Sequence, residues 1–493
     1  MATAGTGSWV TWLHEHWIVL AFLALYGAVL ATHALQGRRR THSRVDYYVG
    51  GRKMGGVAIG LSFFATYSST NSFVGFSGQS YSYGAPWLLL VPAIVLFSLV
   101  AWLWIAPRLR AFTGAVDSVT LADYIGVRFS SNAARVIAAL IIIFASFLYM
   151  TAVFKGIGNL LAVFLDVPYA LVVVLVVVVV MAYTAVGGFI SVVKTDVVQG
   201  AAMLLAAILL FSGVVHSAGG VGAIRDVRAD AATAHLFGWN AALPFAVLAG
   251  IIVAGSIKAV VEPRQLSRFY ALADRRALRR GMKVSTLAFL VVYTLLVPIG
   301  LYAHRIIGSS VADTDLVIPT LLGEAEILPP AVAAFVVVAV LAAAMSSLDS
   351  VLLVMASTWE RDVVSHLRPT RPEEQAVRAT RRYVVIFAFV TALIALRPPG
   401  TIVTLTAFSG SLYAACFFPA IVLGLFWRRG NGPAVMASFA IGILTLLVWP
   451  QLPIGSVVYH VFPAMGLSTL VYAVVSARCE PAAGWSSMPR RLA

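Results

Sequence analysis

Long, nearly continuous apolar runs dominate the chain, and short polar or charged segments separate them. A bilayer core about 30 Å thick is crossed by roughly 20 apolar residues in helical form. A membrane β-barrel would instead show many short segments with alternating apolar and polar positions. The pattern therefore predicts an all-α polytopic membrane protein with about 13 transmembrane helices. The expected spans are 14–35, 57–80, 86–106, 132–160, 168–186, 189–215, 243–263, 282–303, 329–358, 381–396, 400–427, 431–449 and 456–477.

Composition supports this interpretation. Of 493 residues, 60% are hydrophobic and only 11% are charged, with a mean hydropathy of +0.91. A soluble domain carries roughly 25% charged residues, so this chain has too few charges to cover a water-facing surface. A soluble enzyme, a disordered chain and a fibrous protein are excluded. Cys416 lies in an apolar run and Cys479 in the tail, so we expect no structural disulfide and no metal-binding cysteine pattern.

The positive charges predict the orientation. The net charge is +15, and basic clusters follow the odd-numbered spans one, three, seven, nine and eleven. The cluster after span seven includes Arg264 and Arg268, whereas loops on the other side carry acids such as Asp313 and Asp315. Cytoplasmic loops are enriched in Lys and Arg. We therefore expect a protein of the cell (inner) membrane with its N-terminus outside and its C-terminus in the cytoplasm, and no nucleic-acid partner.

Span two contains a polar run at the depth of the membrane centre. Residues 66–72 read TYSSTNS, seven hydroxyl or amide side chains in succession. Such side chains compete with the backbone for hydrogen bonds and loosen a helix. Unwound backbone at that depth is tolerated only beside protein or a wet cavity. The pattern predicts an interrupted helix, and the alternative is simple helix–helix packing through small polar residues.

Three later spans also depart from plain apolar helix. Span seven places Lys258 inside the membrane, between the helix-weakening residues Gly255 and Pro263. An intramembrane lysine suggests a functional site, although it could snorkel or pair with Glu262 one turn on. Span nine carries adjacent hydroxyls one turn after a small residue, and residues 408–411 of span eleven predict another polar break.

Spans two and seven, the two with the strongest breaks, lie five spans apart. Two five-helix repeats of opposite topology, with a site where the broken helices meet, would produce this pattern. The expected organisation is an N-terminal extra helix and basic loop, a first repeat, a second repeat, and two C-terminal helices with a tail. Their expected ranges are 1–56, 57–215, 243–427 and 428–493.

Several segments resemble the sodium/solute symporter family, which has the LeuT-type inverted-repeat fold. The similarity covers roughly residues 45 to 430. It is carried, in the family's order, by segments 46–52 (DYYVGGR), 183–189 (YTAVGGF) with 194–199 (KTDVVQ), 343–350 (AAMSSLDS) and 424–429 (GLFWRR). The resemblance implies a transporter and not an enzyme, with broken first and sixth core helices.

The resemblance also implies a Na⁺ site that joins the first and eighth core helices. Na⁺ is a hard cation that prefers oxygen ligands. Matching the family motif to this sequence gives the ligands as the carbonyls of Ala65, Ser68 and Ala343 and the hydroxyls of Ser346 and Ser347.

Asp196 matches an acid of the family that is implicated in ion release. The alternative is a charge at a helix N-terminus or a loop ion pair.

The implied substrate site lies between the first and sixth core helices, at Tyr67, Ser69 and Ser72, with Lys258 opposite. Tyr67 departs from the family, in which an amide or acid is common there. A cation beside hydroxyls suits a small carboxylate. We therefore expect sodium-coupled import of a monocarboxylate or an amino-acid-like anion by alternating access.

Two alternatives keep this fold: a proton-coupled symporter that depends on Asp196 or Glu262, and a carrier of sugars or other neutral solutes. A channel is disfavoured, because the sequence shows no repeated pore-lining rings of charges or carbonyls. A membrane enzyme is disfavoured because the nine histidines fall at or near span ends. The oligomeric state stays open.

Overall fold

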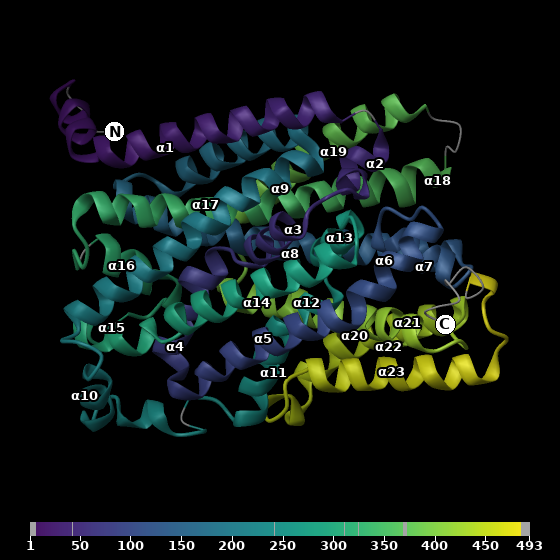
Figure 1. Ribbon diagram of the computed structural model, residues 1–493. Helices are drawn as coiled ribbons and strands as arrows, with labels where there is room; N and C mark the ends of the chain where they lie inside the picture. The colour runs from purple at the N-terminus through teal and green to yellow at the C-terminus, as the bar shows by residue number, and fades with distance from the viewer. Residues whose placement is uncertain are drawn as a thin grey trace.

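The protein is a bundle of long helices that run side by side (Figure 1). The computed structural model describes residues 6–41, 43–240, 242–309, 311–323, 325–367 and 372–484. The predicted first and last segments extend beyond these ranges, at residues 1–5 and 485–493. Within the described residues the structure contains no β-strand, and one isolated bridge joins Met54 to Leu272. The predicted all-α class is confirmed.

Helices form where the apolar runs predict them. The long ones are α1 (Thr6–Arg40), α5 (Leu90–Val100), α6 (Ala106–Ala115), α8 (Asn132–Leu165), α9 (Tyr169–Ser217), α14 (Arg275–Leu296), α15 (Ile299–Ile307), α17 (Pro330–Thr358), α19 (Glu373–Ala395), α20 (Ile402–Phe418), α22 (Gly432–Val448) and α23 (Val461–Arg478). Short helices are α2 (Arg44–Val49), α7 (Leu121–Arg128), α10 (Ala223–Ala229), α16 (Val317–Gly323), α18 (Ser365–Leu367) and α21 (Gly424–Phe426). Ten helical stretches of the described residues are long and apolar enough to cross a membrane, so the chain is multi-pass, and the count of thirteen stays a prediction.

Helix α9 is two spans joined at a glycine. Its 49 residues would measure about 74 Å as one straight helix at 1.5 Å per residue, more than twice the bilayer core. Gly188 leaves helical geometry with φ 64° and ψ −170°. The predicted spans 168–186 and 189–215 therefore meet at a sharp change of direction within one assigned helix.

Replacing Gly188 by alanine is expected to destabilise the protein by about 1–3 kcal/mol, because this backbone region is essentially restricted to glycine. A Cβ atom there would also lie 2.7 Å from the ring of Tyr47. Thermal unfolding in detergent measures the effect. The matched control is Gly27→Ala, since a Cβ at Gly27 meets nothing within 4 Å. Equal melting temperatures for the two variants would contradict this interpretation of the kink.

Both predicted breaks in spans two and seven are confirmed. Span two consists of α3 (Gly56–Tyr67), a π-helical turn at Asn71–Gly75 and α4 (Phe76–Tyr83), and Ser68 has extended backbone between them. Span seven consists of α11 (Phe245–Ser256), α12 (Lys258–Val261) and α13 (Pro263–Ala271), with extended backbone at Glu262. The broken helices therefore present backbone groups in the interior.

The predicted break at residues 408–411 is wrong. Helix α20 continues through this segment. The hydroxyl of Ser409 donates to the carbonyl of Ala145 on α8, at 2.9 Å. A small polar side chain that bonds to the neighbouring helix does not need to unwind its own helix.

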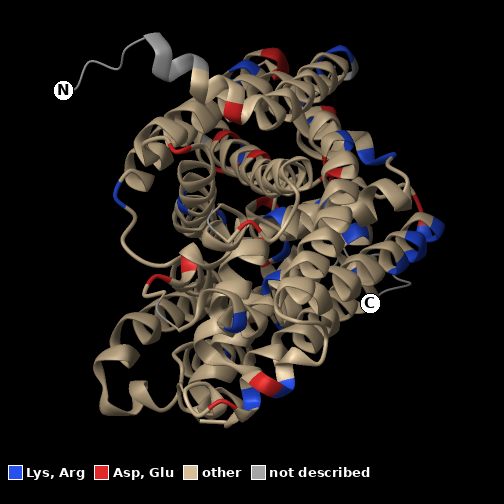
Figure 2. Ribbon diagram, turned by 90° about the vertical axis from the view of Figure 1, so that its left-hand side faces the viewer, with Lys and Arg blue, Asp and Glu red and all other residues tan. Residues whose placement is uncertain are grey.

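The broken helix α3 lies at the centre of the bundle. It packs against α14 and α9, while α17 packs against α9 and α8 and α20 packs against α8. In the view along the helices, acidic and basic positions lie inside the ring of helices as well as at its rim (Figure 2). Buried charged residues include Asp196, Lys258, Glu262, Arg264, Arg268 and Asp349. A polar interior of this kind marks the region where function resides.

Candidate functional site

The end of α3 has backbone groups that do not follow the helical hydrogen-bond pattern. The N–H of Ser69 donates to the hydroxyl of Ser72 at 3.3 Å, so it does not close a helical bond to the carbonyl of Ala65. The amide of Gln265 on α13, oriented to satisfy its partners, donates to the carbonyl of Phe63 (3.1 Å) and accepts from the N–H of Tyr67 (3.0 Å). A side chain that bridges helical backbone groups in this way accounts for the end of the helix.

Helix α17 brings the hydroxyl of Ser347 to this break. The hydroxyl of Ser347 donates to the carbonyl of Thr66 at 3.1 Å and to that of Ser68 at 3.3 Å. Ala65, Ser68, Ala343, Ser346 and Ser347 are all fully buried. The structure thus brings the two chain regions that contain the predicted Na⁺ ligands together at one point. Neutral carbonyl and hydroxyl oxygens are a donor set that fits a hard monovalent cation.

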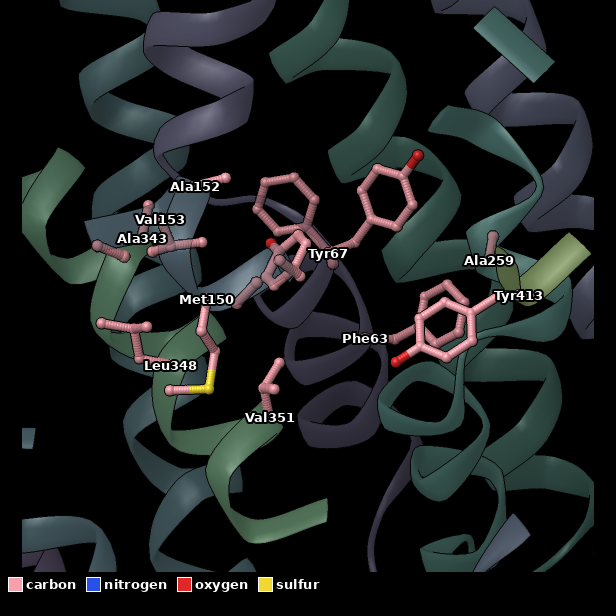
Figure 3. Packing of buried hydrophobic residues seen from close by; sticks show 14 of the residues in the cluster. Phe63, Tyr67, Met150, Ala152, Val153, Ala259, Ala343, Leu348, Val351 and Tyr413 are labelled. Carbon is pink, nitrogen blue, oxygen red and sulfur yellow. The ribbon is translucent and has the colours of Figure 1, made fainter. Parts of the chain in front are cut away.

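One side of this point is apolar. Figure 3 shows Tyr67 near the centre of the view, with Ala343 of α17 and Met150 and Val153 of α8 on one side of it. All four belong to the buried core. Apolar walls keep water out, which strengthens every polar interaction inside them.

Asp196 is fully buried on α9, about two turns beyond Gly188. Its carboxylate accepts hydrogen bonds from Ser62 and Ser346, both at 2.5 Å, and pairs with Arg268 of α13 at 3.0 Å. Both readings of Asp196 as a helix N-terminal charge or a loop ion pair are therefore wrong. The carboxylate instead holds the hydroxyl of Ser346, one of the predicted Na⁺ ligands.

Arg268 was expected in a basic loop, and that expectation is wrong. It is fully buried on α13, and its Nη2 atom donates to Thr66 (2.6 Å), Ser350 (2.6 Å) and Asp196 (3.0 Å). The sequence signal that could have revealed it is Pro263, because proline is favoured at the first position of a helix. A new helix starting there carries the arginines back into the bundle.

The predicted substrate residues are buried, and three of them already have hydrogen bonds. Tyr67 donates to the carbonyl of Gly255 at 2.7 Å, which ties the two broken spans together. The hydroxyl of Ser72 lies 2.7 Å from that of Tyr293. The Ser69 hydroxyl accepts from the N–H of Asn71 at 3.1 Å. These contacts hold the loop between α3 and α4 in shape.

Lys258 is 2% exposed, so it does not snorkel to the interface. Its ammonium lies 5.1 Å from the ring centroid of Tyr149 on α8. Pairing of Lys258 with Glu262 is also wrong, because Glu262 binds the Nε atom of Arg264 at 2.7 Å.

Tyr149 is a residue that sequence reasoning missed. Its ring stacks under the guanidinium of Arg264, 3.8 Å from the centroid, and its hydroxyl donates to Ser347 at 3.4 Å. Tyr149 thereby connects the buried cations of the second broken span with α17. An aromatic residue in an apolar helix carries no sequence signal that distinguishes this position from ordinary core.

A multi-pass helical bundle with two centrally broken helices is the architecture of a secondary transporter with the LeuT-type fold. The chain belongs to the sodium:solute symporter family (SSF), because the sequence model of that family matches residues 47–442. It is therefore a multi-pass membrane symporter and not an enzyme, with Na⁺ as the coupling ion and a small organic solute as cargo.

Characterised relatives match over almost the whole chain. A sodium/pantothenate symporter of Haemophilus influenzae is 28% identical over 469 residues, 93% of this chain and 94% of the relative. An osmoregulated proline transporter of Bacillus subtilis is 29% identical over the same proportions of both chains.

Solved structures agree on the fold. A Na⁺-coupled sialic acid symporter in a substrate-bound outward-open state aligns with a TM-score of 0.82 at 19% identity, covering 94% of this chain and 98% of that one. Mhp1, a nucleobase-cation-symport-1 family transporter, aligns with a TM-score of 0.55 at 15% identity, covering 90% and 97%.

Proposed function

We propose that this symporter imports a monocarboxylate or an amino-acid-like anion together with Na⁺. The observation that carries the proposal is the contact of Ser347 with the carbonyls at the end of α3, directly beside a group of buried cations. Among the relatives, pantothenate and proline are the named solutes, and each bears one carboxylate. A buried cation is stabilised by a carboxylate placed beside it, and both of these solutes carry that group.

In this proposal Na⁺ is held by the carbonyls of Ala65, Ser68 and Ala343 and by the hydroxyls of Ser346 and Ser347. The ion would brace the broken end of α3 against α17. The hydroxyl proton of Ser347 would turn away from the carbonyls so that its oxygen faces the cation. Neutral oxygens bind Na⁺ without a fixed charge, so the ion can be released again.

Asp196 belongs to the release side of the same proposal. Its carboxylate already accepts a hydrogen bond from the Ser346 hydroxyl and pairs with Arg268. An anion there attracts a cation that leaves the neutral site. The Arg268 guanidinium balances this charge and keeps Na⁺ from being trapped.

Transport follows from coupling between the proposed Na⁺ site and the proposed solute site. Solute and ion must raise each other's affinity by the same factor. The membrane potential adds about 2.3 kcal/mol per positive charge per 100 mV. For alternating access we propose two repeats that move relative to each other, the first at 57–215 and the second at 243–427. Segments 1–56 and 428–493 are additional to these repeats. The proposed orientation keeps the basic loops and the C-terminus in the cytoplasm and the N-terminus outside.

Uptake by reconstituted proteoliposomes tests the proposal. Labelled pyruvate, lactate, propionate, proline and a neutral sugar are offered with and without an inward Na⁺ gradient. The expected result is accumulation of one or more of the carboxylates only when Na⁺ is present. Accumulation of the sugar alone would overturn the proposed solute class. Uptake that follows a proton gradient equally well without Na⁺ would overturn the proposed coupling at this site.

Lys258→Ala is expected to raise the KM for the transported carboxylate roughly ten- to a hundredfold, since a charge-assisted hydrogen bond contributes about 1.5–3 kcal/mol. Initial uptake rates against solute concentration measure it. The matched control is Lys283→Ala, which removes an exposed lysine from α14. Unchanged uptake of pyruvate, lactate, propionate and proline in Lys258→Ala would exclude the lysine from the binding site.

A further inference from the structure

A cluster of three buried charges at the second broken span is not used by the proposed Na⁺ site. Lys258, Glu262 and Arg264 are each 2% exposed. We call them the Lys258–Glu262–Arg264 cluster. Buried charges are costly unless each one is paired and hydrogen-bonded. Polar atoms of this cluster that have no hydrogen-bond partner therefore indicate where a ligand would bind.

Arg264 offers two unused nitrogens. Its Nε atom binds Glu262 Oε1 at 2.7 Å. Its Nη1 and Nη2 atoms are buried and have no hydrogen-bond partner among the described residues, and the same holds for Glu262 Oε2. A guanidinium presents its terminal N–H groups as a planar fork that matches the two oxygens of a carboxylate. A purely structural pair would leave both the fork and the second carboxylate oxygen of Glu262 unsatisfied.

The cluster lies beside the proposed Na⁺ site. Arg264 stacks on the ring of Tyr149 at 3.8 Å, and Lys258 lies 5.1 Å from the same ring. The hydroxyl of Tyr149 donates to Ser347 at 3.4 Å. Arg264 is also the second residue of α13, so the positive end of that helix dipole adds to its charge. An anion held by Arg264 would therefore lie next to the cation that drives its transport.

The charge balance selects the kind of anion. Two cations and one carboxylate leave the cluster with one excess positive charge. A solute with a single negative charge neutralises it, whereas a zwitterion leaves the charge uncompensated in a region of low dielectric constant. The free oxygen of Glu262 accepts a hydrogen bond and repels a second carboxylate. A neutral donor on the solute, such as a hydroxyl, satisfies this oxygen.

We propose that the Arg264 fork binds the solute carboxylate, that Lys258 adds a second positive contact, and that Glu262 Oε2 accepts a hydrogen bond from a solute hydroxyl. The preferred cargo is then a hydroxylated monocarboxylate. This inference rests on the proposed function and narrows its solute class. Sequence reasoning missed Arg264 because the residue follows an apolar span and reads as part of a basic loop.

Proteoliposome uptake of labelled lactate, propionate and proline under a Na⁺ gradient tests the inference. The wild type is expected to prefer lactate to propionate, and proline to be the poorest of the three. Arg264→Gln should raise the KM for both acids by roughly tenfold or more, and Arg264→Lys by less, because an ammonium cannot bind both oxygens as a fork. Glu262→Gln should lower the preference for lactate over propionate. Arg275→Gln, at an exposed position of α14, is the matched control.

Two further readouts separate binding from folding. Lactate in the presence of Na⁺ should raise the melting temperature of the wild type and not that of Arg264→Gln. Binding of ²²Na⁺ without solute should stay within about twofold of the wild type. If Arg264→Gln does not fold, the rise in the KM for lactate and propionate expected for Arg264→Lys tests the inference instead.

The outcomes distinguish this inference from the proposed function. If the wild type imports monocarboxylates and Arg264→Gln and Arg264→Lys keep its KM, the inference is wrong and the proposed function stands. A wild type that prefers proline or propionate to lactate also overturns the inference alone. If the wild type imports no organic acid, or imports it independently of Na⁺, the proposed function itself fails.

Discussion

Replacing Ser347 by alanine is expected to raise the Na⁺ concentration for half-maximal uptake at least about tenfold, because one of five proposed oxygen ligands is lost. The same hydroxyl also links α17 to the end of α3 through the carbonyls of Thr66 and Ser68. Both effects weaken the state that receives the solute. Solute uptake measured against Na⁺ concentration, at a fixed membrane potential, gives the shift directly.

The control for this variant lies on the same helix. Ser357→Ala removes a buried hydroxyl that donates to the carbonyl of Val354 on its own helix, and its Na⁺ dependence should match the wild type. Ser347→Thr keeps the hydroxyl and should retain most of the Na⁺ affinity. An unchanged Na⁺ dependence in a folded Ser347→Ala protein would exclude Ser347 as a ligand and weaken the whole proposed site.

Asp196→Asn is expected to destabilise the protein by about 3–5 kcal/mol, since breaking a buried ion pair leaves an uncompensated charge in the interior. Asp196 and Arg268 are both fully buried and lie 3.0 Å apart. The double variant Asp196→Asn/Arg268→Met removes both charges and should recover a large part of this loss. Melting temperatures in detergent for the two single variants and the double variant form the cycle that isolates the pair.

Transport by the same variants separates stability from ion release. If Asp196 guides Na⁺ from the hydroxyl of Ser346 toward the cytoplasm, the double variant regains stability and still transports slowly. Full recovery of both would assign Asp196 a structural role only. A single variant as stable as the wild type would show that the ion pair contributes nothing to the fold.

Local sequence patterns were sufficient to predict the transmembrane spans and the break in span two. A run of apolar residues can cross a bilayer only as a helix, because every backbone group must find its partner inside the segment. The run from Thr66 to Ser72 supplies competing hydrogen-bond groups where water is absent, and the helix does end at Tyr67. The segment at 408–411 misled the same reasoning, since one neighbouring carbonyl satisfies Ser409 without any unwinding.

The charged interior depended on contacts between distant segments. Arg268 meets Asp196, which lies 72 positions earlier in the chain, and no local pattern pairs them. Glu262 pairs with Arg264 across the extended backbone that ends α12, a partner that the one-turn spacing to Lys258 does not indicate. Pro263 then begins a buried helix where the charge pattern indicated a loop.

The sequence by itself determined the membrane class and the positions of the two broken helices, because burial without water acts on each segment separately, and its motifs indicated the family. Only the tertiary structure decided which buried charges are paired and which atoms stay unpaired. A charge buried in a region of low dielectric constant pairs with a group on any element that packs beside it. Its partner therefore depends on the tertiary packing and not on the local sequence.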